Sequence, residues 1–171
     1  PFLDRFEAAA KEGFQGVEYL FPYAYPKARL AEHLRAHALQ QILHNMPGGD
    51  WDAASRGIAC LPDRVGEFQD GVGKAIEYAT ALGCKQVNCL AGIAPADLDP
   101  ERCKRTLVDN LAFAAPRLAQ AGIRLLIEPI NTPDIPGFFL TTTRQALEIL
   151  AQVGSDNLFV QYDIYHMQIM E

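Results

Sequence analysis

One short unit recurs along the chain: an alanine-rich amphipathic segment, a glycine, a few polar residues and then an apolar run. The glycines of its four copies are Gly13, Gly83, Gly122 and Gly154. Because glycine readily takes the left-handed conformation that ends a helix, each of these residues predicts a helix end followed by a strand. A further strand at 41–44 follows a predicted helix at 27–38 without such a glycine. This alternation of helices and strands predicts βα units and a parallel sheet.

Polar residues stand at or near the ends of the successive predicted strands, which are otherwise short and mostly apolar, as buried parallel strands should be. These residues are Glu18, His44, Asn88, Glu128 and Asp163. Polar groups from most strands converge on one axis only if the sheet closes, which favours an α/β fold of the (β/α)8 TIM barrel type over an open sheet. The first predicted strand is followed by neither G-x-G-x-x-G nor a P-loop motif, so a nucleotide-binding open sheet is unsupported.

The length of the chain limits how much of a barrel it can form. A complete (β/α)8 barrel takes about 250 residues, whereas this chain has 171. Its pattern provides about five strands and a leading helix at 2–12. We therefore expect a single domain over 1–171 that forms an incomplete TIM barrel, about strands 2–6 with their helices. The first strand would then precede Pro1, and the last two βα units would follow Glu171.

Composition excludes several classes of protein. The chain is 49% hydrophobic, which suits one globular domain with a core, and its formal net charge of −6 argues against binding to a nucleic acid backbone. The four cysteines contain no Cys-x-x-Cys pair, the pattern of reduced thiols. No apolar run approaches the length of a membrane span, and the N-terminus shows no signal sequence. We expect a cytoplasmic protein with no nucleic acid or membrane partner.

Two apolar runs end on a carboxylate, at Glu128 and at Asp163. A buried strand gains nothing from a carboxylate at its tip unless something pairs with it, and at the carboxyl ends of parallel strands that partner is usually a metal or a substrate. His166 follows Asp163 by one turn, and carboxylate and imidazole together suit Mg²⁺, Mn²⁺ or Zn²⁺. The pattern predicts a metal-assisted active site. The alternatives are that Glu128 caps a surface loop and that Asp163 caps a helix beside a buried histidine.

Other polar residues are weaker candidates. His44 either lines the site or is a core imidazole, and Asn88 and Glu18 either contribute to the pocket or fill the barrel interior with hydrogen bonds. The long connection at 45–64 carries Trp51 and resembles an ordered lid, in which Arg56 would neutralise a substrate carboxylate or form a surface salt bridge.

Four segments resemble the hydroxypyruvate isomerase family, part of the xylose isomerase-like superfamily of TIM barrels. They lie at 16–23, 43–51, 128–137 and 161–167, and include Glu128-Pro129-Ile130-Asn131 and Tyr162-Asp163-Ile164-Tyr165-His166. The pair Thr132-Pro133 departs from the aromatic-rich pair expected there, which affects the loop and no catalytic residue. The resemblance extends over essentially the whole chain.

The resemblance implies isomerisation of a small 2-oxo acid through a metal-stabilised enediol: hydroxypyruvate to tartronate semialdehyde, or 2-oxo-tetronate to 3-oxo-tetronate. Glu128 would be a metal ligand and the acid/base, Asp163 a second ligand of a divalent ion, with Mg²⁺ or Mn²⁺ favoured. His166 would hydrogen-bond the substrate oxygen and His44 would line the pocket; Arg56 and Asn88 complete the expected substrate-binding residues. The family takes two more metal ligands from later strands. We therefore expect the 171 residues alone to be inactive.

Three other functions stay open at this stage. A sugar 3-epimerase or ketose isomerase of the same superfamily would share the Glu, the Asp-x-x-His and the enediol route. An apurinic endonuclease of this fold is disfavoured because the chain has only four histidines and an acidic balance. A non-catalytic barrel remnant could serve as a binding or scaffold protein. The oligomeric state is open, and a homo-oligomer is compatible with the sequence.

Overall fold

The computed structural model describes residues 1–53 and 55–171. Within these residues, five strands form one parallel sheet in the order β1-β2-β3-β4-β5. The strands are β1 (Gly16–Glu18), β2 (Gln40–Asn45), β3 (Gln86–Cys89), β4 (Arg124–Ile127) and β5 (Leu158–Val160). Sequential order in a parallel sheet is the arrangement of a TIM barrel wall, so the predicted α/β class and parallel sheet are confirmed.

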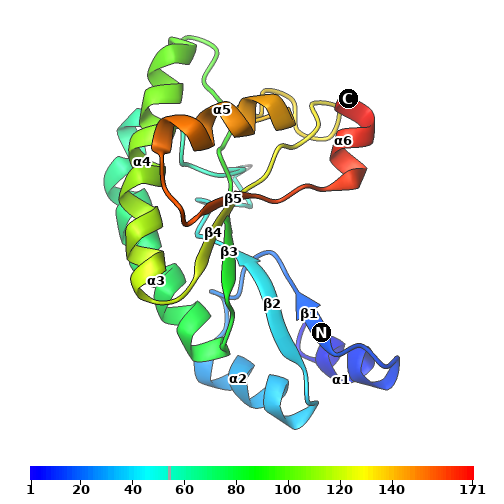
Figure 1. The fold of residues 1–171 in the computed structure, drawn as a ribbon. Helices are drawn as coiled ribbons and strands as arrows, with labels where there is room; N and C mark the ends of the chain where they lie inside the picture. The colour runs from blue at the N-terminus through cyan, green and yellow to red at the C-terminus, as the bar shows by residue number, and fades with distance from the viewer. Residues whose placement is uncertain (54) are drawn as a thin grey trace.

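Helices connect the strands. They are α1 (Asp4–Lys11), α2 (Lys27–Ala36), α3 (Val65–Leu82), α4 (Pro100–Gln120), α5 (Thr143–Val153) and α6 (Ile164–Met170), with a short 3-10 helix at Pro62–Arg64. Helices α2 to α5 follow one another along the outer side of a curved sheet, and the opposite, concave side faces away from them (Figure 1). In the described residues β1 and β5 are the two edges of the sheet and do not pair with each other.

The core lies between the helices and the outer face of the sheet. In β4, Leu125 and Ile127 are fully buried, whereas Leu126 between them lines a cavity on the concave side with Leu43 of β2. Successive side chains of a strand point to opposite faces, so this alternation turns the next residue, Glu128, toward the concave side. The packing of β4 against the helices thus decides where the carboxylate points.

The helix ends agree with the glycine pattern. All four predicted C-terminal glycines have positive φ: Gly13 (83°), Gly83 (68°), Gly122 (68°) and Gly154 (63°). The helix without a glycine also needs a left-handed residue, and there Ala38 takes φ 53°. The end of α2 therefore contains a local strain that glycine would not have.

The boundaries differ from expectation by a few residues. The helix predicted at 27–38 ends at Ala36, and the strand predicted at 41–44 extends over Gln40–Asn45. The pairing of β1 with β2 shifts register between Val17 and Glu18. All four cysteines are buried thiols. Among the described helices, none combines the length and the apolar character needed to span a bilayer.

Candidate active site

The carboxyl ends of the five strands border a pocket of about 460 Å³. Five of its lining residues were predicted from the sequence as candidate site residues: Glu18, His44, Glu128, Asp163 and His166. They lie in or after every strand except β3. Trp51, the polar residues Asn45 and Gln161, and several mostly apolar side chains complete the wall. The predicted convergence of polar strand ends is therefore present in the structure.

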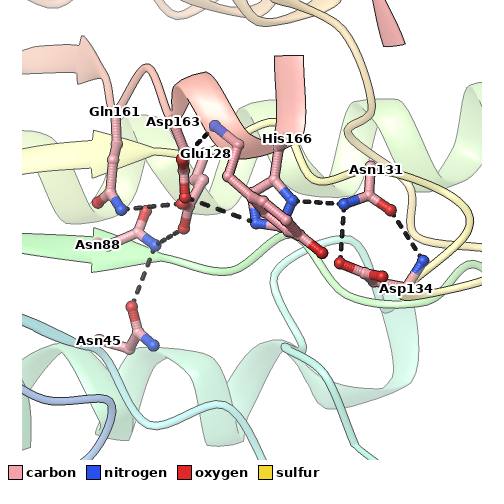
Figure 2. Close-up of polar contacts among 9 residues, drawn as sticks. Asn45, Asn88, Glu128, Asn131, Asp134, Gln161, Asp163 and His166 are labelled. Atoms are coloured by element: carbon pink, nitrogen blue, oxygen red, sulfur yellow. Dashed lines mark hydrogen bonds and ion pairs between the residues drawn. The ribbon is translucent and has the colours of Figure 1, made fainter. Parts of the chain in front are cut away.

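Glu128 is the most buried carboxylate that lines the pocket. It follows β4 directly, is only 8% exposed, and accepts hydrogen bonds on both oxygens: Asn88 Nδ2 lies 2.8 Å from Oε2, and Gln161 Nε2 lies 2.9 Å from Oε1 (Figure 2). Burial raises the pKa of Glu128 to about 7, and the nearby charge of Asp163 adds to the shift. A carboxylate in this state can gain and lose a proton near neutral pH.

Asn88 holds Glu128 in place from β3. Its side chain is fully buried, and its Nδ2 also donates to Asn45 Oδ1 at 3.1 Å. The residue thus supports the carboxylate from behind rather than forming the pocket wall. Its predicted contact with substrate stays a prediction.

Asp163 and His166 lie next to Glu128. One ligand-type atom from each of these three residues falls within 4.8 Å of the others, and His166 Nε2 is 3.8 Å from Asp163 Oδ2. Asp163 also caps α6, because its Oδ1 accepts from the backbone N–H of Tyr165 at 2.8 Å. Asp163 therefore caps the helix and also lies in the three-residue cluster, and its metal-binding role stays a prediction.

The donor set of this cluster suits a divalent cation. Two carboxylates lie close together with no cationic side chain in the same group of described residues, and their mutual repulsion contributes to the raised pKa of Glu128. A cation placed between such groups would relieve that repulsion, and carboxylate oxygens are preferred by Mg²⁺ and Mn²⁺. The residues present therefore fit a metal of this kind.

His44 lines the pocket, and one of its ring nitrogens has no hydrogen-bond partner among the described residues. Its Nδ1 is 3.0 Å from the carbonyl oxygen of Asn45 and 3.4 Å from the hydroxyl of Tyr23, whereas its buried Nε2 has no hydrogen-bond partner in the described part of the chain. Burial lowers the pKa of His44, which favours the neutral ring. A neutral ring that donates from Nδ1 to a carbonyl has an acceptor at Nε2. His44 therefore has an unused acceptor at Nε2, and its contact with a substrate stays a prediction.

Arg56 packs on the aromatic ring of Trp51. Its guanidinium carbon lies 4.3 Å from the ring centroid of Trp51, and its Nη1 donates to the carbonyl oxygens of Trp51 and Ser55. Arg56 thus contacts the loop that carries the pocket-lining Trp51. The ring of Trp51 also packs on that of Phe21, with the two ring centroids 4.9 Å apart. A direct contact between Arg56 and a substrate stays a prediction.

Sequence reasoning did not single out Gln161 or Asn131. Gln161 follows β5 and binds Glu128, and Asn131 is fully buried and touches His166 (Figure 2). The signal available for Gln161 was its position as the first polar residue after the apolar run of β5. The signal available for Asn131 was its residue type, because asparagine side chains often hydrogen-bond the backbone of their own turn.

Comparison with known proteins finds one matching family and several similar relatives. The family described as xylose isomerase-like TIM barrel matches residues 6–171. Hydroxypyruvate isomerase of Escherichia coli is 56% identical over 99% of the chain and 66% of its own length. A 2-oxo-tetronate isomerase of Cupriavidus necator is 49% identical over 99% of the chain and 65% of its own length.

A solved structure described as an AP endonuclease, family 2, from Brucella melitensis superposes with a TM-score of 0.97 at 44% identity, over all of this chain and 66% of that one. The chain thus spans about two-thirds of the length of these relatives.

Proposed function

Because the chain belongs to the xylose isomerase-like TIM barrel family, we propose that it forms the acid/base and metal-binding part of an isomerase site for a small 2-oxo acid. The sequence identities of 56% to a hydroxypyruvate isomerase and 49% to a 2-oxo-tetronate isomerase support this reaction class. The substrate would be hydroxypyruvate or 2-oxo-tetronate, the compounds after which those relatives are named.

The observation that carries the proposal is the state of Glu128. Isomerisation of a 2-oxo acid requires a group that removes a weakly acidic proton next to a carbonyl, and such a base works best with a pKa near the operating pH. Burial and Asp163 bring the pKa of Glu128 to about 7, and Asn88 and Gln161 fix both of its oxygens. Glu128 would take the proton on a carboxylate oxygen and hold it during the reaction.

The other residues would bind and orient the substrate. Glu128 and Asp163 would hold a divalent cation, most suitably Mg²⁺ or Mn²⁺, which when bound supplies Lewis-acid polarisation of the substrate oxygens. His166 would donate a hydrogen bond to a substrate oxygen as negative charge develops there. His44 would accept from a substrate hydroxyl, and Trp51 would exclude water from the reacting carbons.

We propose further that residues 1–171 form a single domain that is an incomplete TIM barrel, and that turnover belongs to a chain of the relatives' length. Two observations support this: the chain spans about two-thirds of those relatives, and the edges of its sheet, β1 and β5, do not pair with each other in the described residues. Additional metal ligands and a second proton-transfer group would come from further strands. The 171 residues alone should bind divalent metal weakly and show no turnover.

The test compares the 171-residue chain with a protein of the relatives' length, each stripped of metal and resupplied with Mg²⁺ or Mn²⁺. Hydroxypyruvate, 2-oxo-tetronate and neutral ketoses are assayed side by side. In the longer protein, Glu128→Gln should lower kcat by about 10²–10⁴, whereas Glu148→Gln on the exposed side of α5 should leave it unchanged.

Each alternative has its own outcome in this assay. Preference for a neutral ketose would favour a sugar 3-epimerase over the proposed function. Absence of turnover on every substrate in the longer protein would favour a non-catalytic barrel. Metal-dependent turnover by the 171 residues alone would contradict the proposed division of the site.

A further inference from the structure

The loop after Glu128 contacts the imidazole of His166 through Asn131. We propose that Asn131 is a positioning residue that keeps the proton of neutral His166 on Nε2, so that His166 offers the pocket an N–H donor and not a metal-binding lone pair. The inference deepens the proposed function, since it assigns the ligands of the same site. It is tested by a property of the imidazole that does not depend on turnover.

The first step is the orientation of the Asn131 side chain. The backbone N–H of Asp134 lies 2.8 Å from Asn131 Oδ1. A backbone N–H can only donate, so the oxygen of the amide must face it, and the NH₂ group must face the other way. Asn131 is fully buried, which leaves its amide no competing contact with solvent. The local turn therefore fixes which end of the amide points toward α6.

The second step concerns the two acceptors of that NH₂ group. Nδ2 lies 2.9 Å from Asp134 Oδ2 and 2.7 Å from His166 Nδ1 (Figure 2). An amide nitrogen has two hydrogens and no lone pair, so both partners must accept. His166 Nδ1 consequently carries a lone pair, and a neutral imidazole with an unprotonated Nδ1 carries its hydrogen on Nε2.

The third step follows from where Nε2 points. It lies 3.8 Å from Asp163 Oδ2, on the side of the ring that belongs to the Glu128–Asp163–His166 cluster. A protonated Nε2 has no lone pair for a cation. The three-residue cluster therefore divides into two oxygen ligands, Glu128 and Asp163, and one hydrogen-bond donor, His166. An all-oxygen pair favours Mg²⁺ or Mn²⁺ over ions that prefer imidazole.

The experiment exchanges the carboxylate and the amide of the loop. Combining Asn131→Asp with Asp134→Asn keeps the net charge and the size of both side chains but places a carboxylate against His166 Nδ1. A carboxylate can only accept, so the proton of the imidazole should move to Nδ1. Asp134→Asn alone is the matched control, because the backbone N–H of residue 134 still orients the Asn131 amide and the proton should stay on Nε2.

The readout is long-range ¹H–¹⁵N NMR of metal-free protein labelled in its histidines, at a pH where the imidazole is neutral. The resonances of His166 are assigned by their loss in His166→Gln. The unaltered protein should show a protonated Nε2 and an unprotonated Nδ1, and the double variant should show the reverse.

Two results would overturn the proposal: a proton on Nδ1 in the unaltered protein, or a folded double variant that keeps its proton on Nε2. If the double variant does not fold, Asn131→Leu replaces it, and this variant should lose the strict preference and populate both tautomers. An unchanged single tautomer in Asn131→Leu would also contradict the role of Asn131. Failure of the isomerase assay with the expected tautomers would refute the proposed function and leave this inference standing.

Discussion

The side-chain amide of Asn88 donates to Glu128 Oε2 over 2.8 Å and thereby ties the end of β3 to the end of β4. Gln161 makes the equivalent bond to the other oxygen from the end of β5. Both donors are neutral, so they fix the direction of the carboxylate without balancing its charge. Their bonds lower the pKa of Glu128, but burial and Asp163 outweigh them and the pKa stands at about 7. Orientation and charge are thus controlled by different neighbours.

The pKa of Glu128 predicts a pH-dependent stability. Its pKa is about 7 in the folded metal-free chain, against an ordinary value of 4.5 for a glutamate side chain. Between these values the unfolded chain has already lost the proton that the folded chain retains, so the free energy of unfolding falls as pH rises through this window. Above the window, the ionised Glu128 should lower the free energy of unfolding by up to about 3 kcal/mol. Urea unfolding at several pH values, in the presence of a chelator, measures this loss.

Glu128→Gln is the variant that isolates the effect. Below the window, the difference in free energy of unfolding between Glu128→Gln and Glu148→Gln should stay nearly constant with pH. Above the window, Glu128→Gln should be the more stable of the two variants. A difference between the two variants that does not change with pH would contradict the raised pKa.

Removal of the Asn88 amide should raise the pKa of Glu128 further. The bond from Asn88 favours the charged carboxylate, and its loss in Asn88→Ala also leaves Asn45 Oδ1 without this donor. We expect a cost of about 1–3 kcal/mol in stability, together with an upward shift in the ¹³C-detected titration of Glu128. Asn157→Ala is the control, since its amide donates to the carbonyls of Ala115 and Ile123. It should destabilise the protein without moving the titration.

Gly57 should tolerate no side chain. Its φ is 113°, and a Cβ built there would lie 2.4 Å from the carbonyl oxygen of Leu90. Because that neighbour is backbone, Gly57→Ala must displace the loop that carries Trp51, at a cost of about 2–3 kcal/mol. Gly73→Ala, in the open middle of α3, should instead stabilise the protein by up to about 1 kcal/mol. Thermal unfolding of the two variants tests the contrast, and equal effects would contradict it.

Ala38 is a position where glycine should improve the protein. The residue is exposed and has φ 53° at the end of α2. A left-handed alanine costs about 1–2 kcal/mol, of which the greater flexibility of unfolded glycine cancels part. Ala38→Gly should therefore stabilise by about 0.5–1 kcal/mol. Ala36→Gly, two residues earlier at the last residue of α2, should destabilise by up to about 1 kcal/mol. Chemical denaturation distinguishes the two, and a loss of stability in both would contradict the left-handed conformation.

Much of the fold could be predicted because its signals are local. The left-handed requirement at Gly83 or Gly154 is a property of a few consecutive bonds, and the apolar runs before Glu128 and Asp163 report burial of short strands. Once the sheet is parallel, strand ends must meet at one edge. The grouping of Glu128, Asp163 and His166 was therefore predicted before any contact was known; their catalytic and metal-binding roles remain proposals.

The partners of those groups could not be predicted in the same way. The bond from Asn88 to Glu128 depends on the register of β3 against β4, which pairs Cys89 with Ile127. The loop conformation that stacks Arg56 on Trp51 gave that arginine a neighbour that its position in the sequence does not indicate. Such contacts join distant parts of the chain and leave no local pattern.

The sequence by itself thus determined the helix–strand order, the parallel sheet and the identity of the carboxylates at its edge, because backbone preference and hydrophobic periodicity act over a few residues. Only the tertiary structure decided the protonation of Glu128 and the direction of the His166 imidazole. The first depends on burial and on the charge of Asp163, and the second on Asn131. Electrostatic environment and hydrogen-bond geometry exist only when the separate strand ends are brought together in three dimensions.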